Sequence, residues 1–195
     1  MRSRRKKVPD PEVFDAIVRV MMRVGPADLT LGAIAAEAGL TAGALVQRFG
    51  SKRELMLAHA RHAAATGDIG LGAKPARKGS ALRAIRAAVV PFAELAASPE
   101  AALRNLAYLQ RDLADSALYK NLVSMNRKAR EHYGELVAAA VSARELRADT
   151  NVAALARTIE VTLLGSFLAW AIYREGSAAR WLRRDLDAAL RLYVI

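Results

Sequence analysis

Start and stop signals for helices alternate along the whole chain, and this pattern constrains its fold more than any other feature. In the first third, Thr30 and Thr41 each precede a short segment with apolar residues at helical spacing, and Gly39 separates the two segments. A threonine side chain at an N-cap bonds a free backbone amide, and glycine ends a helix easily because it adopts left-handed backbone angles. These signals predict short helices at about 31–38 and 41–49.

The same signals place the other helices. Asp10 is expected to cap a helix that begins at Pro11 and ends before Gly25, and Ser51 and Glu54 form a capping box for a helix to about residue 65. Ala, Leu and Arg dominate the composition while only 12 Gly and 6 Pro occur, which favours helix. The sequence therefore predicts an all-α fold of about nine helices, the later ones at about 80–97 with an interruption at Pro91, 99–114, 116–146, 151–174 and 177–194.

A concentration of turn residues between Thr66 and Ser80 indicates a linker between two modules. The predicted domains are residues 1–66, which include a basic N-terminal arm, and residues 67–195. The turn residues are Gly67, Gly70, Gly72, Pro75 and Gly79.

Charge and cysteine usage restrict the partners and the compartment. Lys and Arg number 30 against 19 Asp and Glu, and this net charge of +11 favours a polyanion, with nucleic acid ahead of an anionic membrane or an acidic protein. The absence of Cys suits the reducing cytoplasm. The most apolar segment, 161–172, is expected to be too short to span a membrane, so we expect a soluble cytoplasmic protein without a membrane partner.

No sequence pattern points to catalysis. HExxH, GxxxxGK[ST] and GxSxG motifs are missing, and His59 and His62 have no third ligand beside them, so they are expected to be a surface pair rather than a metal site. We expect no enzyme activity and no cofactor.

The segment from Leu29 to Leu55 is the one that predicts a function. Two short helices around a glycine turn are what a helix-turn-helix needs to place its second helix in the major groove of DNA. On that second helix Leu45 and Phe49 share one side. The opposite side is small and nearly uncharged, so its backbone can approach bases, and it carries Ala42, Gly43, Val46 and Gln47. An ordinary helical hairpin is the alternative interpretation.

Polar residues near this face suggest specific contacts. Gln47 suits a paired hydrogen bond to adenine, and Arg48 lies at the margin of the face, within reach of a phosphate or guanine. Lys52 and Arg53 occupy a first helical turn, where the helix dipole disfavours cations and a bound phosphate would favour them. The alternative is that Glu54 and solvent offset the charge.

The stretch from Phe14 to about His59 resembles the DNA-binding domain of the TetR family, most clearly from Leu40 to Leu55. The resemblance implies a helix-turn-helix domain followed by a helical domain that binds a small-molecule inducer and dimerises. Val46 departs from the family pattern, which often has Tyr there. The matching DNA-contact positions are Thr30, Thr41, Ala42, Gly43, Ala44, Val46, Gln47, Arg48 and Lys52.

We therefore expect a transcriptional regulator, a repressor by resemblance, that binds a palindromic operator on double-stranded DNA as a dimer and is released by a small, largely apolar effector. The alternatives are an architectural DNA-binding protein without an effector and, more distantly, a helical enzyme. The run from Arg2 to Lys7 is either an arm that follows the DNA backbone or a solubilising tail.

Two further sets of residues are expected in the second domain. The last two helices are predicted to form the dimer interface through two apolar stripes, Val152, Leu155, Ile159, Leu163, Ser166 and Trp170, and Leu182, Leu186, Leu190 and Tyr193. The candidate effector site consists of bulky groups and one amide on the middle helices, Phe92, Asn105, Tyr108, Met125, Tyr133, Leu164 and Phe167.

Overall fold

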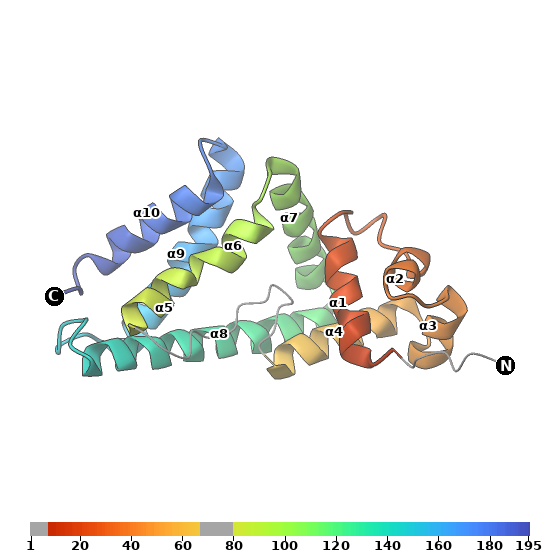
Figure 1. Ribbon diagram of the computed structural model, residues 1–195, viewed down its shortest axis with the longest axis horizontal. Coiled ribbons are helices and arrows are strands. Elements are labelled where there is room, and N and C mark those ends of the chain that lie inside the picture. Colours follow the sequence, from red (N-terminus) through yellow and green to blue (C-terminus); the bar gives the residue numbers. More distant parts are fainter. Residues whose placement is uncertain (1–7, 67–79) are drawn as a thin grey trace.

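The computed structural model describes residues 8–66 and 80–195, and within these residues the chain folds into ten α-helices (Figure 1). An isolated bridge between Leu146 and Val194 is the sole β-type pairing found in the described part, which agrees with the predicted all-α fold. The helices are α1 (Asp10–Met21), α2 (Leu31–Glu37), α3 (Ala42–Phe49), α4 (Lys52–Thr66), α5 (Ala81–Ala87), α6 (Val89–Leu95), α7 (Pro99–Ala114), α8 (Ser116–Ser142), α9 (Val152–Tyr173) and α10 (Ala178–Leu190).

The expected helix at 80–97 is two helices in the structure. α5 ends at Ala87, and α6 begins at Val89, with Pro91 in its first turn. A proline inside one continuous helix would lose a hydrogen bond and press its ring against the carbonyl four residues earlier, whereas a first turn has free amides in any case. The chain therefore breaks at Ala88, ahead of the proline.

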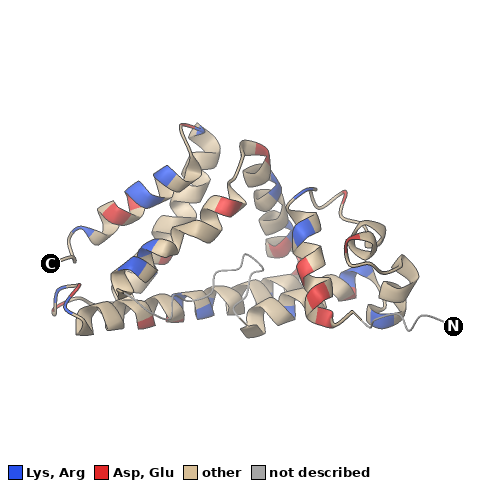
Figure 2. Cartoon of the chain, in the orientation of Figure 1, with Lys and Arg blue, Asp and Glu red and all other residues tan. Residues whose placement is uncertain are grey.

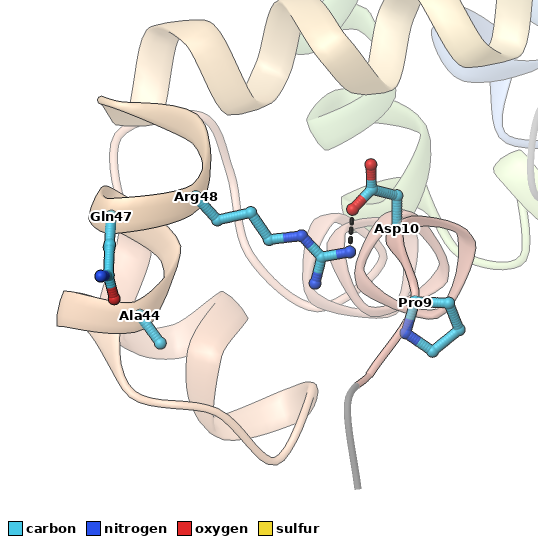
Figure 3. A pocket seen from close by; sticks show the side chains of 5 residues that line it. All are labelled: Pro9, Asp10, Ala44, Gln47 and Arg48. Carbon is cyan, nitrogen blue, oxygen red and sulfur yellow. Dashed lines mark hydrogen bonds and ion pairs between the residues drawn. The ribbon is translucent and has the colours of Figure 1, made fainter.

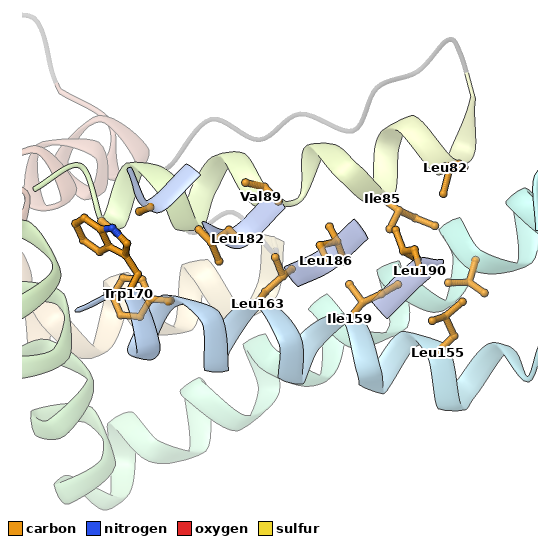
Figure 4. Packing of buried hydrophobic residues seen from close by; sticks show 14 of the residues in the cluster. Leu82, Ile85, Val89, Leu155, Ile159, Leu163, Trp170, Leu182, Leu186 and Leu190 are labelled. Carbon is orange, nitrogen blue, oxygen red and sulfur yellow. The ribbon is translucent and has the colours of Figure 1, made fainter. Parts of the chain in front are cut away.

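Two hydrophobic cores organise the helices. The N-terminal core lies between α1, α2, α3 and α4, and Tyr108 of α7 inserts into it with a relative exposure of 3%. The C-terminal core is built from α5 to α10, and Figure 4 shows the leucines of α10 packed between α5 and α9. The long helix α8 packs against α4 with one part of its length and against α5 and α9 with the rest.

The predicted domain boundary at 66/67 falls at the end of α4 and at the edge of a segment, 67–79, that lies outside the described residues. The division into 1–66 and 67–195 stays a prediction.

The end of the chain departs from the expected helix to residue 194. α10 ends at Leu190, and the amide of Arg147 donates to the carbonyl of Tyr193 at 2.8 Å, beside the bridge between Leu146 and Val194. α8 likewise ends at Ser142 rather than near residue 146. Backbone pairing between the α8–α9 connection and the last residues therefore replaces the last helical turn in both places.

The two histidines of α4 are not a surface pair. The rings of His59 and His62 lie 5.9 and 5.0 Å from the Phe14 ring of α1, and both histidines are half-buried. They belong to the contact between α1 and α4.

Helix α9 has an uncovered apolar face as well as a buried one. It is 22 residues long and contains an 18-residue stretch with a mean hydropathy of 1.5, so by length and composition it could cross a membrane. The apolar segment is therefore longer than the expected 161–172. Yet its other side packs into the C-terminal core, and its Glu160 is bound by Arg130 of α8 at 2.5 Å. A core helix passes the same test of length and composition, and these internal contacts are those of a core helix.

Candidate nucleic-acid interface

The turn between α2 and α3 is built by side-chain caps and one left-handed glycine. The hydroxyl of Thr30 accepts from the amide of Ala33 at 3.1 Å, and that of Thr41 accepts from the amide of Ala44 at 3.2 Å. Gly39 has a φ of 66°, which costs a glycine little and lets the chain reverse directly after α2. Both predicted caps are confirmed.

Helix α3 turns one side to the N-terminal core and the other outward. Leu45 is fully buried and Phe49 is half-buried, while the outward side is small and nearly uncharged, as the sequence predicts. Ala44 is half-buried at the edge of this side. The exposed residues are Thr41, Ala42, Gly43, Val46, Gln47 and Arg48.

Arg48, although exposed, is bound to other groups of the protein and is not free at the margin of the outward side of α3. Its guanidinium is ion-paired with Asp10 and donates to the carbonyl of Val8 at 2.6 Å, and Figure 3 shows it reaching from α3 to the start of α1. A depression of about 890 Å³ lies here, lined by Pro9, Asp10, Ala44, Gln47 and Arg48.

Asp10 does not cap α1 as the sequence suggested. The N-cap residue is Pro9, which makes no side-chain cap bond, and Asp10 is the first helical residue. The carboxylate of Asp10 instead bonds Arg48, a partner 38 residues away, so no local sequence signal identifies this contact.

The first turn of α4 lies directly after α3. The hydroxyl of Ser51 accepts from the amide of Glu54 at 3.1 Å, which is one half of the predicted capping box. Lys52 is partly exposed and has no ion pair with any described residue, whereas Arg53 is bound to Asp115, the N-cap of α8, at 2.8 Å. Of the two cations, Lys52 is thus the one left available for a phosphate.

The predicted effector residues do not gather in one place. Phe92, Tyr133 and Phe167 belong to or pack against the C-terminal core, and Met125 is half-buried on α8. Leu164 is 42% exposed on α9.

Two other members of the set hold helix ends. The Asn105 amide donates to the carbonyls of Leu95 and Ala101, at 2.8 and 3.0 Å. The Tyr108 hydroxyl donates to the carbonyl of Val24 at 3.0 Å, and burial raises the pKa of this phenol to about 12.

A second depression, of about 450 Å³, lies where α6 and α9 end and α7 and α10 begin. Small side chains, Trp170 and Arg174 line it, and none of the predicted effector residues takes part. Its lining comes from four helix ends, so periodicity within any one helix gives no sign of it.

The two stripes expected at the dimer interface mostly face the C-terminal core. Leu155, Ile159, Leu163, Leu182 and Leu190 are fully buried inside the single chain. The interface expected through these residues is wrong in detail, because their helical spacing fits a core equally well. The exposed apolar face of α9 is formed by Val161, Leu164, Leu168 and Ile172.

Comparison with known proteins agrees with this architecture. Residues 13–59 match the family model described as bacterial regulatory proteins, tetR family. No curated protein sequence matches the chain.

Solved structures of regulators share the fold over nearly the full length. A TetR transcription regulator from Haloarcula marismortui is 13% identical with a TM-score of 0.73, covering 95% of this chain and 98% of its own. A transcriptional regulator from Saccharomonospora viridis in complex with choline is 13% identical with a TM-score of 0.71, covering 95% and 97%. FadR from Bacillus subtilis in complex with stearoyl-CoA is 15% identical with a TM-score of 0.64, covering 93% and 97%. Residues 13–59, which include the helix-turn-helix of α2 and α3, therefore match the model of the tetR family of bacterial regulatory proteins, and the chain as a whole has the fold of solved transcription regulators.

Proposed function

We propose that this protein is a repressor that binds a palindromic operator as a dimer and releases it when a small, largely apolar effector binds. The observation that carries the proposal is the outward side of α3, where Gln47 stands among small exposed residues over a buried Leu45. One short helix contacts too few bases for useful selectivity, so two copies on a symmetric site are required.

Gly43 supports a role of α3 toward a partner outside the chain. A Cβ built at this position meets no atom within 4 Å, and its φ is not positive, so neither the packing nor the backbone of this chain requires glycine. Glycine in a helix costs about 0.5–1 kcal/mol relative to alanine. A backbone that must approach the base edges closely gives a reason for that cost.

The dimer would form through the exposed face of α9, flanked by α10. This face carries four apolar residues that are 42–67% exposed and contains Gly165, where nothing lies within 4 Å of a built Cβ. Beside this face, the ring of Tyr173 stacks on that of Trp181 of α10, with 5.7 Å between the ring centroids. A second copy of α9 and α10 would cover this apolar surface as a four-helix bundle, which keeps the predicted helices and changes the contributing residues.

The effector would bind within the helices of the C-terminal core. Two proteins of the same fold were solved with choline and with stearoyl-CoA, so the fold accommodates small molecules. Of the expected effector residues, Phe92, Tyr133 and Phe167 are the proposed apolar contacts, because these three share the C-terminal core. The absence of Cys fits the proposed place of action, the cytoplasm.

Selection of operators from a random DNA pool, with footprinting of the region upstream of the protein's own gene, tests the function. The wild type should select a two-fold symmetric sequence. Gln47→Ala should relax the preference at one base position, and Lys52→Ala, as the matched variant, should weaken binding to all sequences alike. A pool that yields no preferred sequence would leave an architectural DNA-binding protein as the function.

A further inference from the structure

The guanidinium of Arg48 makes three contacts within the protein. It is ion-paired with Asp10, donates to the carbonyl of Val8 at 2.6 Å, and lies over the ring of Phe49, with 5.3 Å to the ring centroid. Figure 3 shows the side chain extending from α3 to Asp10, in a different direction from that of Gln47. The one cation of α3 is therefore directed toward the start of α1.

These contacts occupy the part of Arg48 that would recognise a base. An arginine that reads guanine uses two N–H groups of the guanidinium, which donate to O6 and N7 of the base. In Arg48 both terminal nitrogens already donate, Nη1 to Val8 and Nη2 to Asp10. A paired contact with guanine would compete with these bonds and would leave the carboxylate of Asp10 beside DNA without its cation. The ion pair therefore disfavours recognition of a base by Arg48.

The depression beside α3 brings Arg48 close to the residue that is proposed to contact a base. Asp10, Gln47 and Arg48 line this same depression of about 890 Å³. Because Gln47 and Arg48 share it, DNA that lies against Gln47 also lies within reach of the Arg48 guanidinium once its partner is removed. Arginine is the side chain that most often reads guanine. Asp10 therefore decides whether α3 reads one base or two at this place.

The carboxylate of Asp10 does not serve the start of its own helix. The N-cap position is held by Pro9, which makes no side-chain cap bond. An acid in the first turn is favoured by the helix dipole, but Glu12 of the same turn supplies that effect as well. Figure 2 shows acidic residues at the start of α1 close to the basic residue of α3. Among these acids Asp10 is the one that binds Arg48, whereas Glu12 and Asp15 are exposed and have no ion pair with a described residue.

We propose that Asp10 is a specificity-determining residue of the DNA-binding domain. By holding Arg48 in an ion pair, it restricts base recognition on this side of α3 to Gln47 and excludes the preference for guanine that a free Arg48 would add. This inference rests on the proposed DNA-binding function. It replaces the expectation that Arg48 itself contacts DNA.

The first test compares two variants that lose the same charge from one helical turn, by selection of operators from a random DNA pool. Asp10→Ala removes the partner of Arg48, and Glu12→Ala removes an exposed acid without an ion pair to a described residue. Asp10→Ala should select the wild-type operator with an added guanine beside the base that Gln47 contacts, preferred by about 5- to 150-fold over other bases. Glu12→Ala should select the wild-type operator. Asp10→Glu should do so too, because it keeps a carboxylate for Arg48.

The second test asks whether Arg48 reads the added guanine. Arg48→Gln should leave the selected operator unchanged in the wild-type background, because the ion pair already keeps this side chain from the bases. In the Asp10→Ala background it should remove the added guanine, so the two substitutions are non-additive. Thermal unfolding checks that α1 and α3 stay folded, since the loss of a partly exposed ion pair should have a small effect. Residues 2–7 are the same in all variants; they lie outside the described residues, and their contact with DNA stays a prediction.

The outcomes separate this inference from the function on which it rests. Selection of one and the same sequence by Asp10→Ala and Glu12→Ala would show that the release of Arg48 adds no base contact, and would overturn the role of Asp10. A change of the selected operator by Arg48→Gln alone would overturn it as well, because Arg48 would then read DNA in spite of Asp10. In both cases the wild type still selects an operator, whereas failure of the wild type to select any sequence would refute the proposed function.

Discussion

The residues of α3 fall into two groups. One group holds the helix in place, and the other is exposed on its outward side. Leu45 and Phe49 fill the N-terminal core, and Thr41 caps the helix, so changes at these positions act through folding. Gly43 and Gln47 are exposed and do not pack in the core, so substitutions there need not affect folding. The two groups therefore respond differently to substitution.

Gly43→Ala separates stability from DNA binding. The added methyl group meets open space and should stabilise the protein by up to about 1 kcal/mol. The same methyl group would stand between α3 and the bases and should lower operator affinity. Gly134→Ala in α8 is the matched control, since its built Cβ also meets nothing within 4 Å. It should stabilise the fold and leave operator binding unchanged, and an equal effect of both variants on binding would contradict the assignment.

The free energy of unfolding should depend on pH through Glu37, which is ion-paired with Arg19 and Arg23. Hydrogen bonds from Arg19 and then Arg23 lower the pKa of this carboxyl below its ordinary value of 4.5, because both favour the charged form. A depressed folded-state pKa contributes stability above the ordinary value, and that stability is lost as the pH falls through the folded pKa.

Glu37→Gln should therefore lower the free energy of unfolding at neutral pH and converge with the wild type at acid pH. Urea unfolding at a series of pH values measures the difference. Glu12→Gln removes an exposed acid of α1 that has no ion pair with a described residue, and its difference from the wild type should stay small throughout. A gap for Glu37→Gln that widens on acidification would contradict the role of the ion pairs.

At the scale of elements, α9 has one side buried in the C-terminal core and an opposite side that is apolar and exposed. Its buried side carries Ile159 and Leu163, and its polar Ser166 donates to Asp185 of α10 at 2.6 Å. The opposite side is apolar and exposed, with Ile172 at 67%. The two sides together explain why the hydropathy of α9 is high enough to cross a membrane.

Leu168→Arg should convert the proposed dimer to a monomer. The residue is 48% exposed at the middle of the apolar face, so a charge there would be buried without a partner in the dimer and solvated in the monomer. Leu113→Arg on α7, at a position that is 55% exposed, is the control and should remain dimeric. Sedimentation measures the mass of both variants. A dimer that persists in Leu168→Arg would place the interface elsewhere.

At the scale of the whole molecule, α7 joins the two cores. Its Arg104 donates to the carbonyl of Met22 at 3.0 Å, and Tyr108, one turn later, donates to that of Val24. Both acceptors lie just beyond the end of α1. The Nε of Arg104 is buried without a hydrogen bond to any described group. A movement of α7 would therefore act directly on α1 and on the core that holds α3.

Tyr108→Phe should loosen this connection while keeping the ring in the N-terminal core. The missing hydrogen bond should cost about 0.5–1.5 kcal/mol, and amide exchange should accelerate at the end of α1 more than in α10. Tyr119→Phe on α8 removes a hydroxyl from a residue that is 47% exposed and should change neither quantity. Equal acceleration in α1 and α10 would indicate global destabilisation instead of a local coupling.

The sequence by itself determined the helices around the turn and the outward side of α3. Thr30, Thr41 and Gly39 act within three or four residues, and the side of a helix follows from its period, so both are readable along the chain. The same local signals placed the later helices with small errors at their ends and anticipated a break near Pro91.

Only the tertiary structure decided which apolar stripe meets the core and which cation stays free. Leu155 and Leu163 have the same periodicity whether they pack within the chain or against a second copy, so their burial depends on the arrangement of α8, α9 and α10. The partner of Arg48 is Asp10, far away in sequence, because α1 and α3 share one core. Contacts between distant segments depend on how the helices pack, and a pattern of spacing within one helix does not encode that packing.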